Sequence, residues 1–399
     1  MKTKKRIPSA GPRPWSGEKI YFKGDDYFKD VLKAIDGAKR SVDFEVYIYE
    51  KGSLGDRVTA ALVQAARRGV KVRLLVDGVG SPDGSAVYGE KLKRGGVRFK
   101  VYHRLPSFFT FSSRFFGSLF ELKLTRHLRN FWSRLNRRDH RKLVMVDGTK
   151  VWMGGFNVSD QHLESAAGKK AWRDTGIGLS GVKDKTFGLA FDMTWNEKGH
   201  LLPWRIDRRR LIDWLSRKSS SQLVQINATR RLRRRFHREL LEHLRSARRR
   251  IWVTTPYFVP ALPVMRALLH AGLEGRDVRL VLPQESDVPF VRWASMTFFS
   301  PLLKASCRIF EYRKSILHAK TLMVDDWALV GSSNFNHRSF LFDLEVDVVV
   351  QKPASRRALE RQYALDFKES REIFPADLRL RPLWARWLTW LFFRFRHWL

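Results

Sequence analysis

The chain has 399 residues, of which 44% are hydrophobic and 13% aromatic. This length suits one large domain or two domains of about 200 residues, and the composition excludes a chain that is disordered throughout. Lysine and arginine (76) outnumber aspartate and glutamate (40), and the net charge of +36 indicates a polyanionic partner, either nucleic acid or an anionic membrane surface.

The single cysteine, Cys307, excludes an internal disulfide bond and a cysteine-based metal cluster, and it favours a reducing compartment. Residues 1–16 form a basic N-terminal tail, and no apolar stretch of signal-peptide length follows it. The longest run without a charged residue, 251–265, contains three prolines and is shorter than the roughly 20 apolar residues of a membrane-spanning helix. We therefore expect a protein that is soluble or lies on a membrane surface.

An internal repeat organises the rest of the chain. The first half is predicted to contain, in order, strand 39–49, helix 55–68, strand 69–76 and strand 96–102. The second half repeats this order with strand 249–257, helix 263–271, strand 275–282 and strand 306–312. Strands that alternate with helices predict an α/β fold made of two similar α/β/α lobes, each a mixed sheet flanked by helices, related by a pseudo-twofold. We assign the two lobes to 17–215 and 216–374.

The first lobe is expected to carry an insertion at about 103–139, because the stretch that ends at His140 is longer than the matching stretch that ends at His318. This insertion is rich in phenylalanine, lysine and arginine, with few acidic residues. Such a mixture is typical of an interfacial segment on anionic lipid. The alternative is a helical hairpin that packs on the core and leaves its basic side chains in solvent.

Arginine-rich runs occur at 208–210, 230–238 and 248–250. A solvated protein surface is the default interpretation of such runs, and anionic lipid headgroups or a polynucleotide are the alternatives. The C-terminal segment, 375–399, contains four tryptophans and several arginines, and it is too short and too charged to span a bilayer. Since tryptophan favours the headgroup level, we expect an amphipathic segment that lies in the membrane surface. A terminal helix docked in a groove of the core is the alternative.

Each half contains one copy of a His-x-Lys-x4-Asp motif, followed by small residues and an asparagine. The candidate site residues of the first copy are His140, Lys142, Asp147, Gly155 and Asn157. Those of the second copy are His318, Lys320, Asp325, Ser332 and Asn334. A histidine and a lysine two residues apart on a strand project from the same face. Two copies at the same place in a repeat are difficult to explain as packing and indicate one shared site.

Paired imidazoles and lysines suit phosphoryl transfer. A neutral imidazole can attack phosphorus and form a covalent phosphohistidine, while the opposite imidazole, when protonated, donates to the leaving oxygen and later accepts a proton from the acceptor. The lysines would neutralise the non-bridging oxygens, and the asparagines and small residues would add donors and allow close approach of the phosphate. Because the motifs contain no carboxylate cluster or His/Cys set of the metal-ligand type, we expect neither a metal ion nor another cofactor.

Carboxylates accompany both histidines. Asp147 precedes a glycine, so it can close a hairpin turn or position the motif lysine, and with Asp325 it completes the candidate catalytic set. Asp174 and Glu345 each open a strand-like run after the motif of their own half. By the symmetry of the repeat, each could accept a hydrogen bond from the imidazole of the other lobe, which would fix its tautomer and raise its basicity. The alternative is that both are ordinary acids at the start of a strand.

The duplicated motif resembles that of the phospholipase D superfamily. Within this superfamily, five segments are similar to those of bacterial cardiolipin synthases: 255–260, 291–295, 309–312, 317–321 and 328–340. The resemblance extends over roughly 17–374, and it implies a two-lobed fold with the active site between the lobes and both histidines facing one phosphate. It also implies transfer of a phosphatidyl group from one phosphatidylglycerol to the hydroxyl of another, giving cardiolipin and glycerol, with His140 as the nucleophile and His318 as the acid and base.

Many cardiolipin synthases begin with two transmembrane helices, which this chain lacks, so it is similar to the shorter, peripheral members. The resemblance then implies a peripheral protein on the cytoplasmic side of the cell inner membrane, with the anionic phospholipids phosphatidylglycerol and cardiolipin as partners. The aromatic insertion and the C-terminal segment would hold it on the membrane.

Three alternatives stay open. The same site could use water as the acceptor, as a phospholipase D-type hydrolase or a nuclease does, or it could transfer a phosphatidyl group to another alcohol or phospholipid. A non-enzymatic binding protein with a degenerate site is disfavoured because both motifs are intact. Nucleic acid is the less favoured partner, because four tryptophans at a terminus have no evident role in base stacking.

Overall fold

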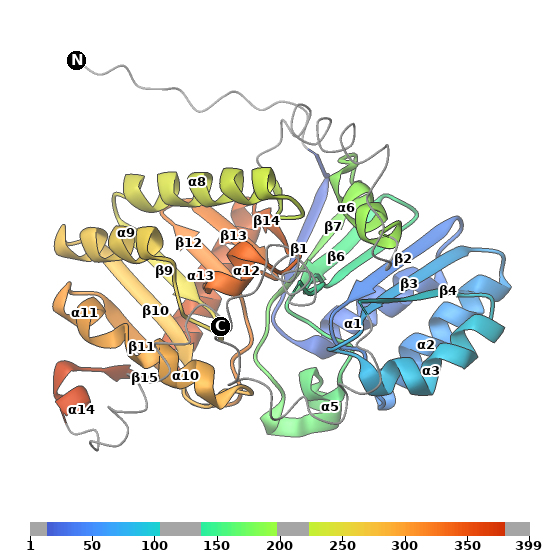
Figure 1. The fold of residues 1–399 in the computed structure, drawn as a ribbon, viewed down its shortest axis with the longest axis horizontal. Helices are drawn as coiled ribbons and strands as arrows, with labels where there is room; N and C mark the ends of the chain where they lie inside the picture. The colour runs from blue at the N-terminus through green and yellow to red at the C-terminus, as the bar shows by residue number, and fades with distance from the viewer. Residues whose placement is uncertain (1–13, 104–136, 198–222, 380–399) are drawn as a thin grey trace, which may run out of the picture.

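The computed structural model describes residues 14–103, 137–197 and 223–379, which form two lobes that lie side by side (Figure 1). Each lobe is built on one mixed β-sheet with helices against it, so the predicted α/β fold class is confirmed. Several predictions fall on residues that lie outside the described ranges: those for the tail up to 13, most of the insertion (104–136), the arginine run 208–210 and the C-terminal segment from 380.

The first sheet has seven strands, of which three neighbours, β2, β3 and β4, are parallel and the others antiparallel. In spatial order the strands are β1 (Gly17–Tyr21), β7 (Gly176–Ser180), β6 (Lys150–Gly154), β5 (Leu143–Val146), β2 (Ser41–Val46), β3 (Lys71–Asp77) and β4 (Arg98–Tyr102). The helices of this lobe are α1 (Gly24–Asp36), α2 (Ser53–Arg67), α3 (Pro82–Arg94), α5 (Glu164–Ala167) and α6 (Thr186–Trp195), with short 3-10 turns η2 (Asp160–His162) and η3 (Gly168–Lys170).

The second sheet has eight strands and repeats the strand order of the first. In spatial order they are β15 (Ser370–Ile373), β11 (Arg308–Tyr312), β10 (Asp277–Pro283), β9 (Arg250–Thr254), β12 (Thr321–Val324), β13 (Trp327–Gly331), β14 (Val346–Val349) and β8 (Val224–Ile226). The helices are α8 (Arg230–Ser246), α9 (Leu262–Leu273), α10 (Pro289–Met296), α11 (Phe299–Lys304), α12 (His337–Leu341), α13 (Pro353–Lys368) and α14 (Pro375–Arg379). The run β4-β3-β2-β5-β6-β7 corresponds strand by strand to β11-β10-β9-β12-β13-β14, so the internal repeat is one of structure as well as sequence.

Helices cover the outer face of each sheet because their apolar residues recur at helical spacing. In α2 the buried residues Leu54, Val58 and Leu62 lie one turn apart and pack, with α1 and α3, on one face of the first sheet. In the second lobe α8, α9 and α11 cover the corresponding face, and α13 packs on the opposite face. Among the described residues, no helix has both the length and the apolar composition that crossing a bilayer requires.

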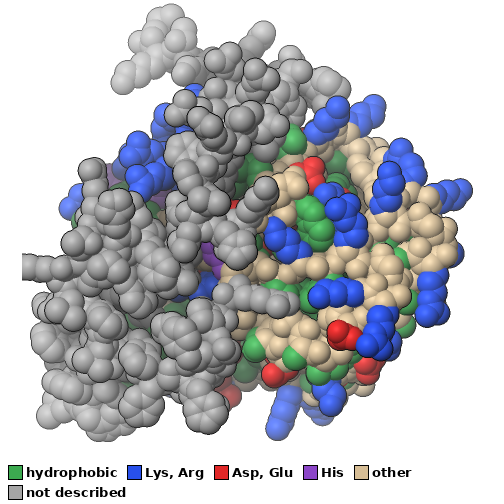
Figure 2. All heavy atoms as spheres, turned by 45° about the vertical axis from the view of Figure 1, so that its right-hand side comes forward, with side chains coloured by type: hydrophobic (Ala, Val, Ile, Leu, Met, Phe, Trp, Pro, Cys, Tyr) green, Lys and Arg blue, Asp and Glu red, His purple; other side chains and the backbone are tan. Residues whose placement is uncertain are grey.

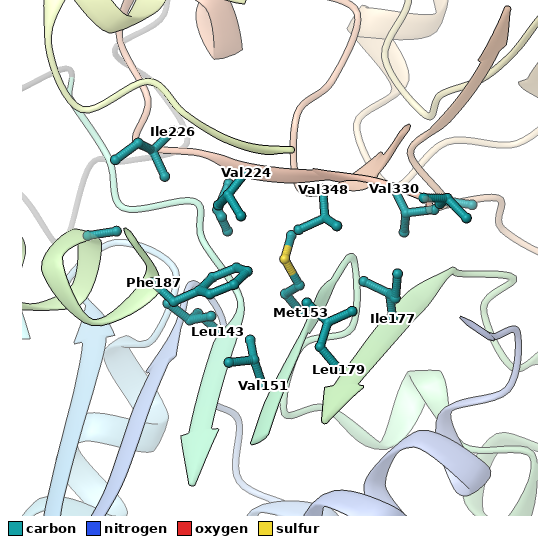
Figure 3. Packing of buried hydrophobic residues seen from close by; sticks show 14 of the residues in the cluster. Leu143, Val151, Met153, Ile177, Leu179, Phe187, Val224, Ile226, Val330 and Val348 are labelled. Atoms are coloured by element: carbon teal, nitrogen blue, oxygen red, sulfur yellow. The ribbon is translucent and has the colours of Figure 1, made fainter. Parts of the chain in front are cut away.

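One apolar layer joins the inner faces of the two sheets (Figure 3). From the first lobe it contains Leu143, Val151, Met153, Ile177, Leu179 and Phe187, and from the second Val224, Ile226, Val330 and Val348. All of these side chains are buried, and withdrawing such a surface from water strongly favours association. The lobes therefore share a core, which holds the ends of β5, β7, β12 and β14 close together.

The structure corrects one detail of the motif segments. His140 and Lys142 come just before β5, and His318 and Lys320 just before β12, so the prediction that these residues lie on a strand was wrong. They occupy the extended connection that enters each strand, where backbone groups are available to pair with the opposite lobe.

Candidate active site

The first-motif histidine reaches the second lobe through a short stretch of backbone pairing. Asp139 forms an isolated parallel bridge with Leu344, and the backbone N–H of His140 donates to the carbonyl of Leu344 at 3.0 Å. This pairing sets the imidazole beside the next side chain, that of Glu345. Nδ1 of His140 lies 3.1 and 3.2 Å from the two carboxylate oxygens of Glu345.

The second-motif histidine makes the reciprocal contact with the first lobe. Arg173 bridges Leu317, and the backbone N–H of His318 donates to the carbonyl of Arg173 at 2.8 Å. Nδ1 of His318 lies 2.6 Å from Oδ2 of Asp174. Each imidazole therefore contacts the acid of the other lobe, which is the pairing expected from the repeat.

The carboxylate of Glu345 is held by hydroxyl groups of its own lobe. Its side chain is 1% exposed, and it accepts hydrogen bonds from Oγ of Ser332 at 2.5 Å and from Oγ of Ser339 at 2.7 Å. The backbone N–H of Glu345 donates to Oδ1 of Asn227 at 2.6 Å. Ser332, a predicted site residue, thus contacts the acid that holds His140.

The carboxylate of Asp174 is held mainly by the backbone. Its Oδ1 accepts the N–H of Thr175 at 2.7 Å, and its side chain is fully buried. A Cβ atom built on Gly155 would lie 2.0 Å from this Oδ1, so the position requires glycine. Gly155, also a predicted site residue, therefore allows Asp174 to approach the backbone.

The two motif lysines are almost completely buried. Nζ of Lys142 donates to the carbonyl of His140 at 2.8 Å, and Nζ of Lys320 donates to the carbonyl of His318. Burial lowers the pKa of Lys142 to about 7, with a further contribution from the charge of Lys320, and it lowers the pKa of Lys320 to about 8. Two ammonium groups in one low-dielectric site favour a bound anion.

Burial also lowers the pKa of both motif imidazoles well below 6.5, and the positive charges of Lys142 and Lys320 lower it further. The charge of His140 also contributes to the low pKa of His318, so the four side chains belong to one site. Burial raises the pKa of Glu345 to about 8 and that of Asp174 above its ordinary value. Near pH 7 the two rings are therefore neutral, and each turns Nδ1 to the acidic side chain of the other lobe.

Aromatic rings that sequence reasoning missed flank the two histidines. The ring of Tyr47, which follows β2, lies 4.9 Å from the ring of His140 and 5.2 Å from Nζ of Lys142. The ring of Trp172 lies 5.4 Å from that of His318. Tyr47 could have been suspected from its place near the end of the predicted strand 39–49 of the repeat, whereas no local pattern marks Trp172.

The two asparagines lie buried after the hairpins that follow the motifs. Oδ1 of Asn157 accepts the backbone N–H of Ile48 at 3.2 Å. Asn334 lines a small cavity together with Lys320, and its Oδ1 has no hydrogen-bond partner in the part of the chain that the structure describes. Their use as donors to a phosphate stays a prediction.

Asp147 and Asp325 lie in hairpin turns away from the histidines, as the turn role given above for Asp147 expects, and a catalytic role for them stays a prediction that this position does not support. Each occupies a hairpin turn, β5–β6 or β12–β13, with a positive φ of 52° or 50°. The carboxylate of Asp147 accepts the backbone N–H groups of 39–41, and that of Asp325 accepts those of 248–250. The reason is geometric: five residues of extended chain carry the aspartate about 16 Å from the motif lysine.

A third imidazole, that of His162, was also missed by sequence reasoning. It is 1% exposed, and its ring centroid lies 5.7 Å from that of His318. Ligand atoms of His162, Asp174 and His318 lie within 4.8 Å of one another, the one group in the described ranges that could hold a metal ion. Lys142 and Lys320 act electrostatically on this group and disfavour a cation there.

Comparison with known proteins shows a family. The profile described as "Cardiolipin synthase, PLD-like domain" matches residues 31–167 and 240–369, one match in each lobe. The chain is 31% identical over 364 residues to the major cardiolipin synthase of Bacillus subtilis, covering 91% of this chain and 71% of the relative. It is 32% identical over 374 residues to cardiolipin synthase 2 of Bacillus cereus, covering 91% and 67%.

Solved structures share the fold at low sequence identity. A phosphatidylserine synthase from Haemophilus influenzae superposes with a TM-score of 0.68 at 12% identity, over 96% of this chain and 95% of that one. A polyphosphate kinase from Porphyromonas gingivalis superposes with a TM-score of 0.52 at 12% identity, over 86% of this chain and 49% of that one. These likenesses concern the two-lobed architecture alone.

Proposed function

The chain belongs to the phospholipase D-like cardiolipin synthase family and is a phosphatidyltransferase that acts on phospholipid, and from that premise we propose the reaction that it catalyses. It transfers a phosphatidyl group from one phosphatidylglycerol molecule to a hydroxyl of a second, which gives cardiolipin and glycerol. The observation that supports this proposal is the pair of buried imidazoles, each held by a carboxylate of the opposite lobe beside two lysines.

In the first step His140 is the nucleophile. Its ring is neutral because burial and the lysines lower its pKa, and with Nδ1 turned to Glu345 the lone pair of Nε2 can attack phosphorus. The N–P bond forms as the bond from phosphorus to the glycerol oxygen breaks. His318 gives its Nε2 proton to that oxygen, so that glycerol leaves as a neutral alcohol.

In the second step the hydroxyl of another phosphatidylglycerol attacks the phosphohistidine. Nε2 of His318 accepts the hydroxyl proton, the new P–O bond forms, and the N–P bond to His140 breaks. His318 takes up from solvent the proton that it needs at the start when the substrate binds, because the negative phosphodiester offsets the lysine charges that lower the pKa of the imidazole. The cycle restores both rings.

The lysines stabilise the charge that develops on the non-bridging oxygens. Lys142 and Lys320 are buried, so their attraction for these oxygens is little screened by water. Asn157 and Asn334 are placed by the same hairpins and add neutral donors in this proposal. Of the two small residues, Gly155 lets Asp174 approach the backbone, and Ser332 donates a hydrogen bond to Glu345.

The reaction takes place at a membrane surface in this proposal, because the substrates are lipids. Lysine and arginine side chains predominate over acidic ones on the face shown in Figure 2, in line with the net charge of +36. On α8 the exposed Arg230, Arg234 and Arg238 follow at four-residue intervals and so lie on one side of the helix. Such a basic surface suits the cytoplasmic side of an anionic inner membrane as a peripheral site.

Replacing the three arginines by alanine should weaken sedimentation with phosphatidylglycerol vesicles while leaving binding to neutral vesicles unchanged.

The decisive experiment follows the products. Purified protein is incubated with vesicles of labelled phosphatidylglycerol, and we expect cardiolipin and free glycerol in equal amounts. The His140→Ala variant is the control and should form neither. Phosphatidic acid without cardiolipin would contradict the proposal and identify a hydrolase that uses water.

A further inference from the structure

His162 and Ser339 occupy the same position of the internal repeat. Each comes five residues after the asparagine that follows its motif, Asn157 in the first half and Asn334 in the second. In the second lobe this residue contacts the catalytic carboxylate, because Oγ of Ser339 donates to Glu345 at 2.7 Å.

The two short helices that carry these residues are built alike. In η2 the side chain of Ser159 caps the first turn by accepting the backbone N–H of Gln161. In α12 the side chain of Asn336, at the matching position, accepts the backbone N–H of Ser339 at 2.9 Å. The equivalence of His162 and Ser339 is therefore structural and not only a matter of counting residues.

His162 lies against the carboxylate of its own lobe. Its Nδ1 is 3.8 Å from Oδ2 of Asp174, the same oxygen that is 2.6 Å from Nδ1 of His318. Among the described residues, neither ring nitrogen of His162 has a hydrogen-bond partner, although the side chain is 1% exposed. Buried polar groups without partners are rare because their desolvation is not offset, so an imidazole here needs a reason other than packing.

The first lobe lacks the second hydroxyl that serves Glu345. Ser332 donates to Glu345 at 2.5 Å, but its counterpart in the first motif is Gly155, where even a Cβ atom would lie 2.0 Å from Oδ1 of Asp174. Asp174 thus has a backbone donor at Oδ1 and the N–H of His318 at Oδ2. The imidazole of His162, with Nδ1 3.8 Å from Oδ2, is a further side-chain donor beside this oxygen.

We infer that His162 is the positioning residue for Asp174, and that in the free enzyme as well as during the reaction it donates Nδ1–H to Oδ2, which weakens the attraction of Asp174 for the proton of His318. This inference rests on the proposed role of His318 as acid and base. A movement of about 1 Å would bring the two atoms to hydrogen-bond distance. Burial lowers the pKa of His162 to about 3, so the ring donates a neutral N–H and adds no charge.

Within the described part of the chain, few other titratable groups surround the rings of His162 and His318. The groups that act on them are Asp174, His140, Lys142 and Lys320, with Arg173 acting on Asp174. None of these changes when His162 is replaced by an uncharged residue. A second donor on Oδ2 withdraws negative charge from it, so loss of that donor should raise the pKa of His318.

Two substitutions separate the donor role from packing. His162→Leu fills the space without an N–H group, whereas His162→Asn keeps a neutral N–H donor in a smaller side chain. We expect His162→Leu to raise the pKa of His318 by about one unit and to lower kcat about tenfold with KM within twofold, since a single hydrogen bond is involved. His162→Asn should restore both quantities to within about twofold of the wild type.

The pKa of His318 is measured by NMR titration of histidine-labelled protein without substrate, and kcat and KM are measured on phosphatidylglycerol vesicles. Ser339→Ala is the matched control and should shift the titration of His140 and leave that of His318 unchanged. Identical His318 titrations in the wild type and in His162→Leu would overturn the inference. So would wild-type kcat in His162→Leu together with reduced kcat in His162→Asn. Because the titration requires no lipid, a failure of the proposed reaction is recognised separately, as absence of cardiolipin with the wild type.

Discussion

The two halves of the site hold their histidines by different means. His140 faces Glu345 almost symmetrically, at 3.1 and 3.2 Å, and two serine hydroxyls fill the remaining positions of that carboxylate. His318 faces Asp174 through one short contact of 2.6 Å, and the neighbour of this carboxylate is another imidazole. The longer glutamate leaves room for a hydroxyl, whereas the shorter aspartate lies so close to the backbone that the facing residue must be Gly155.

This difference suggests a division of labour within the duplicated site. The two serine hydroxyls fix the position of the Glu345 side chain and with it the orientation of the His140 ring, as a nucleophile requires. An acid and base must gain and lose a proton in each cycle. The imidazole of His162, which can move to donate to Asp174, suits that role for His318. The predictions below test this comparison, beginning with the largest effect.

Removing either imidazole should abolish turnover to different extents. His140→Ala should lower kcat by roughly 10⁴-fold or more, because no covalent intermediate can form, while His318→Ala should lower it about 10²–10⁴-fold. With phosphorus-labelled substrate, acid-labile and alkali-stable label should be found on the wild type and on His318→Ala, but not on His140→Ala. Label on the His140 variant alone would reverse the two roles.

Removing either lysine should show how evenly the two halves share the phosphate. Lys142→Ala and Lys320→Ala should each lower kcat about 100-fold, because each removes one contact to the charge that develops in the transition state. Lysine-to-arginine variants are the control, since they keep the charge but not its position. Near-normal turnover in one alanine variant would mean that only the other half contacts the phosphate.

The affinity for a phosphodiester anion should fall as pH rises. The positive charge of Lys142 is present below a pKa of about 7 and that of Lys320 below about 8, so both are lost between pH 6.5 and 9. We expect the Kd of dimethyl phosphate, which stays singly charged over this range, to increase about tenfold by calorimetry. Lys142→Arg should flatten this dependence, because arginine keeps its charge. A Kd that is independent of pH would mean that both lysines are charged throughout.

The two turn aspartates should affect stability and leave catalysis unchanged in both halves. Asp147→Ala and Asp325→Ala each remove an acceptor of three backbone N–H groups, which should cost about 1–2 kcal/mol and lower the melting temperature by a few degrees. Asp326→Ala, at an exposed neighbour, is the control. A large loss of kcat at unchanged melting temperature would return these residues to the catalytic set.

What sequence reasoning missed about the site has a common cause. Asp147 and Asp325 belong to the motif by spacing, but a short strand separates them from the histidines, and spacing does not reveal the length of that strand. Tyr47 and Trp172 reach the site from segments without a motif. His162 could have been found by continuing the alignment of the two halves past Asn157 and asking which residue of the first half corresponds to Ser339.

The amino-acid sequence by itself determined the duplication, the α/β class, the two histidine–lysine pairs and the acids that could serve them, because hydrophobic period and residue chemistry are local properties. Only the tertiary structure decided that Glu345 holds His140 across 205 residues and Asp174 holds His318 across 144, and that a third imidazole stands beside one pair. These contacts depend on how two sheets bury a common apolar layer, and that packing is set by the whole chain rather than by any segment of it.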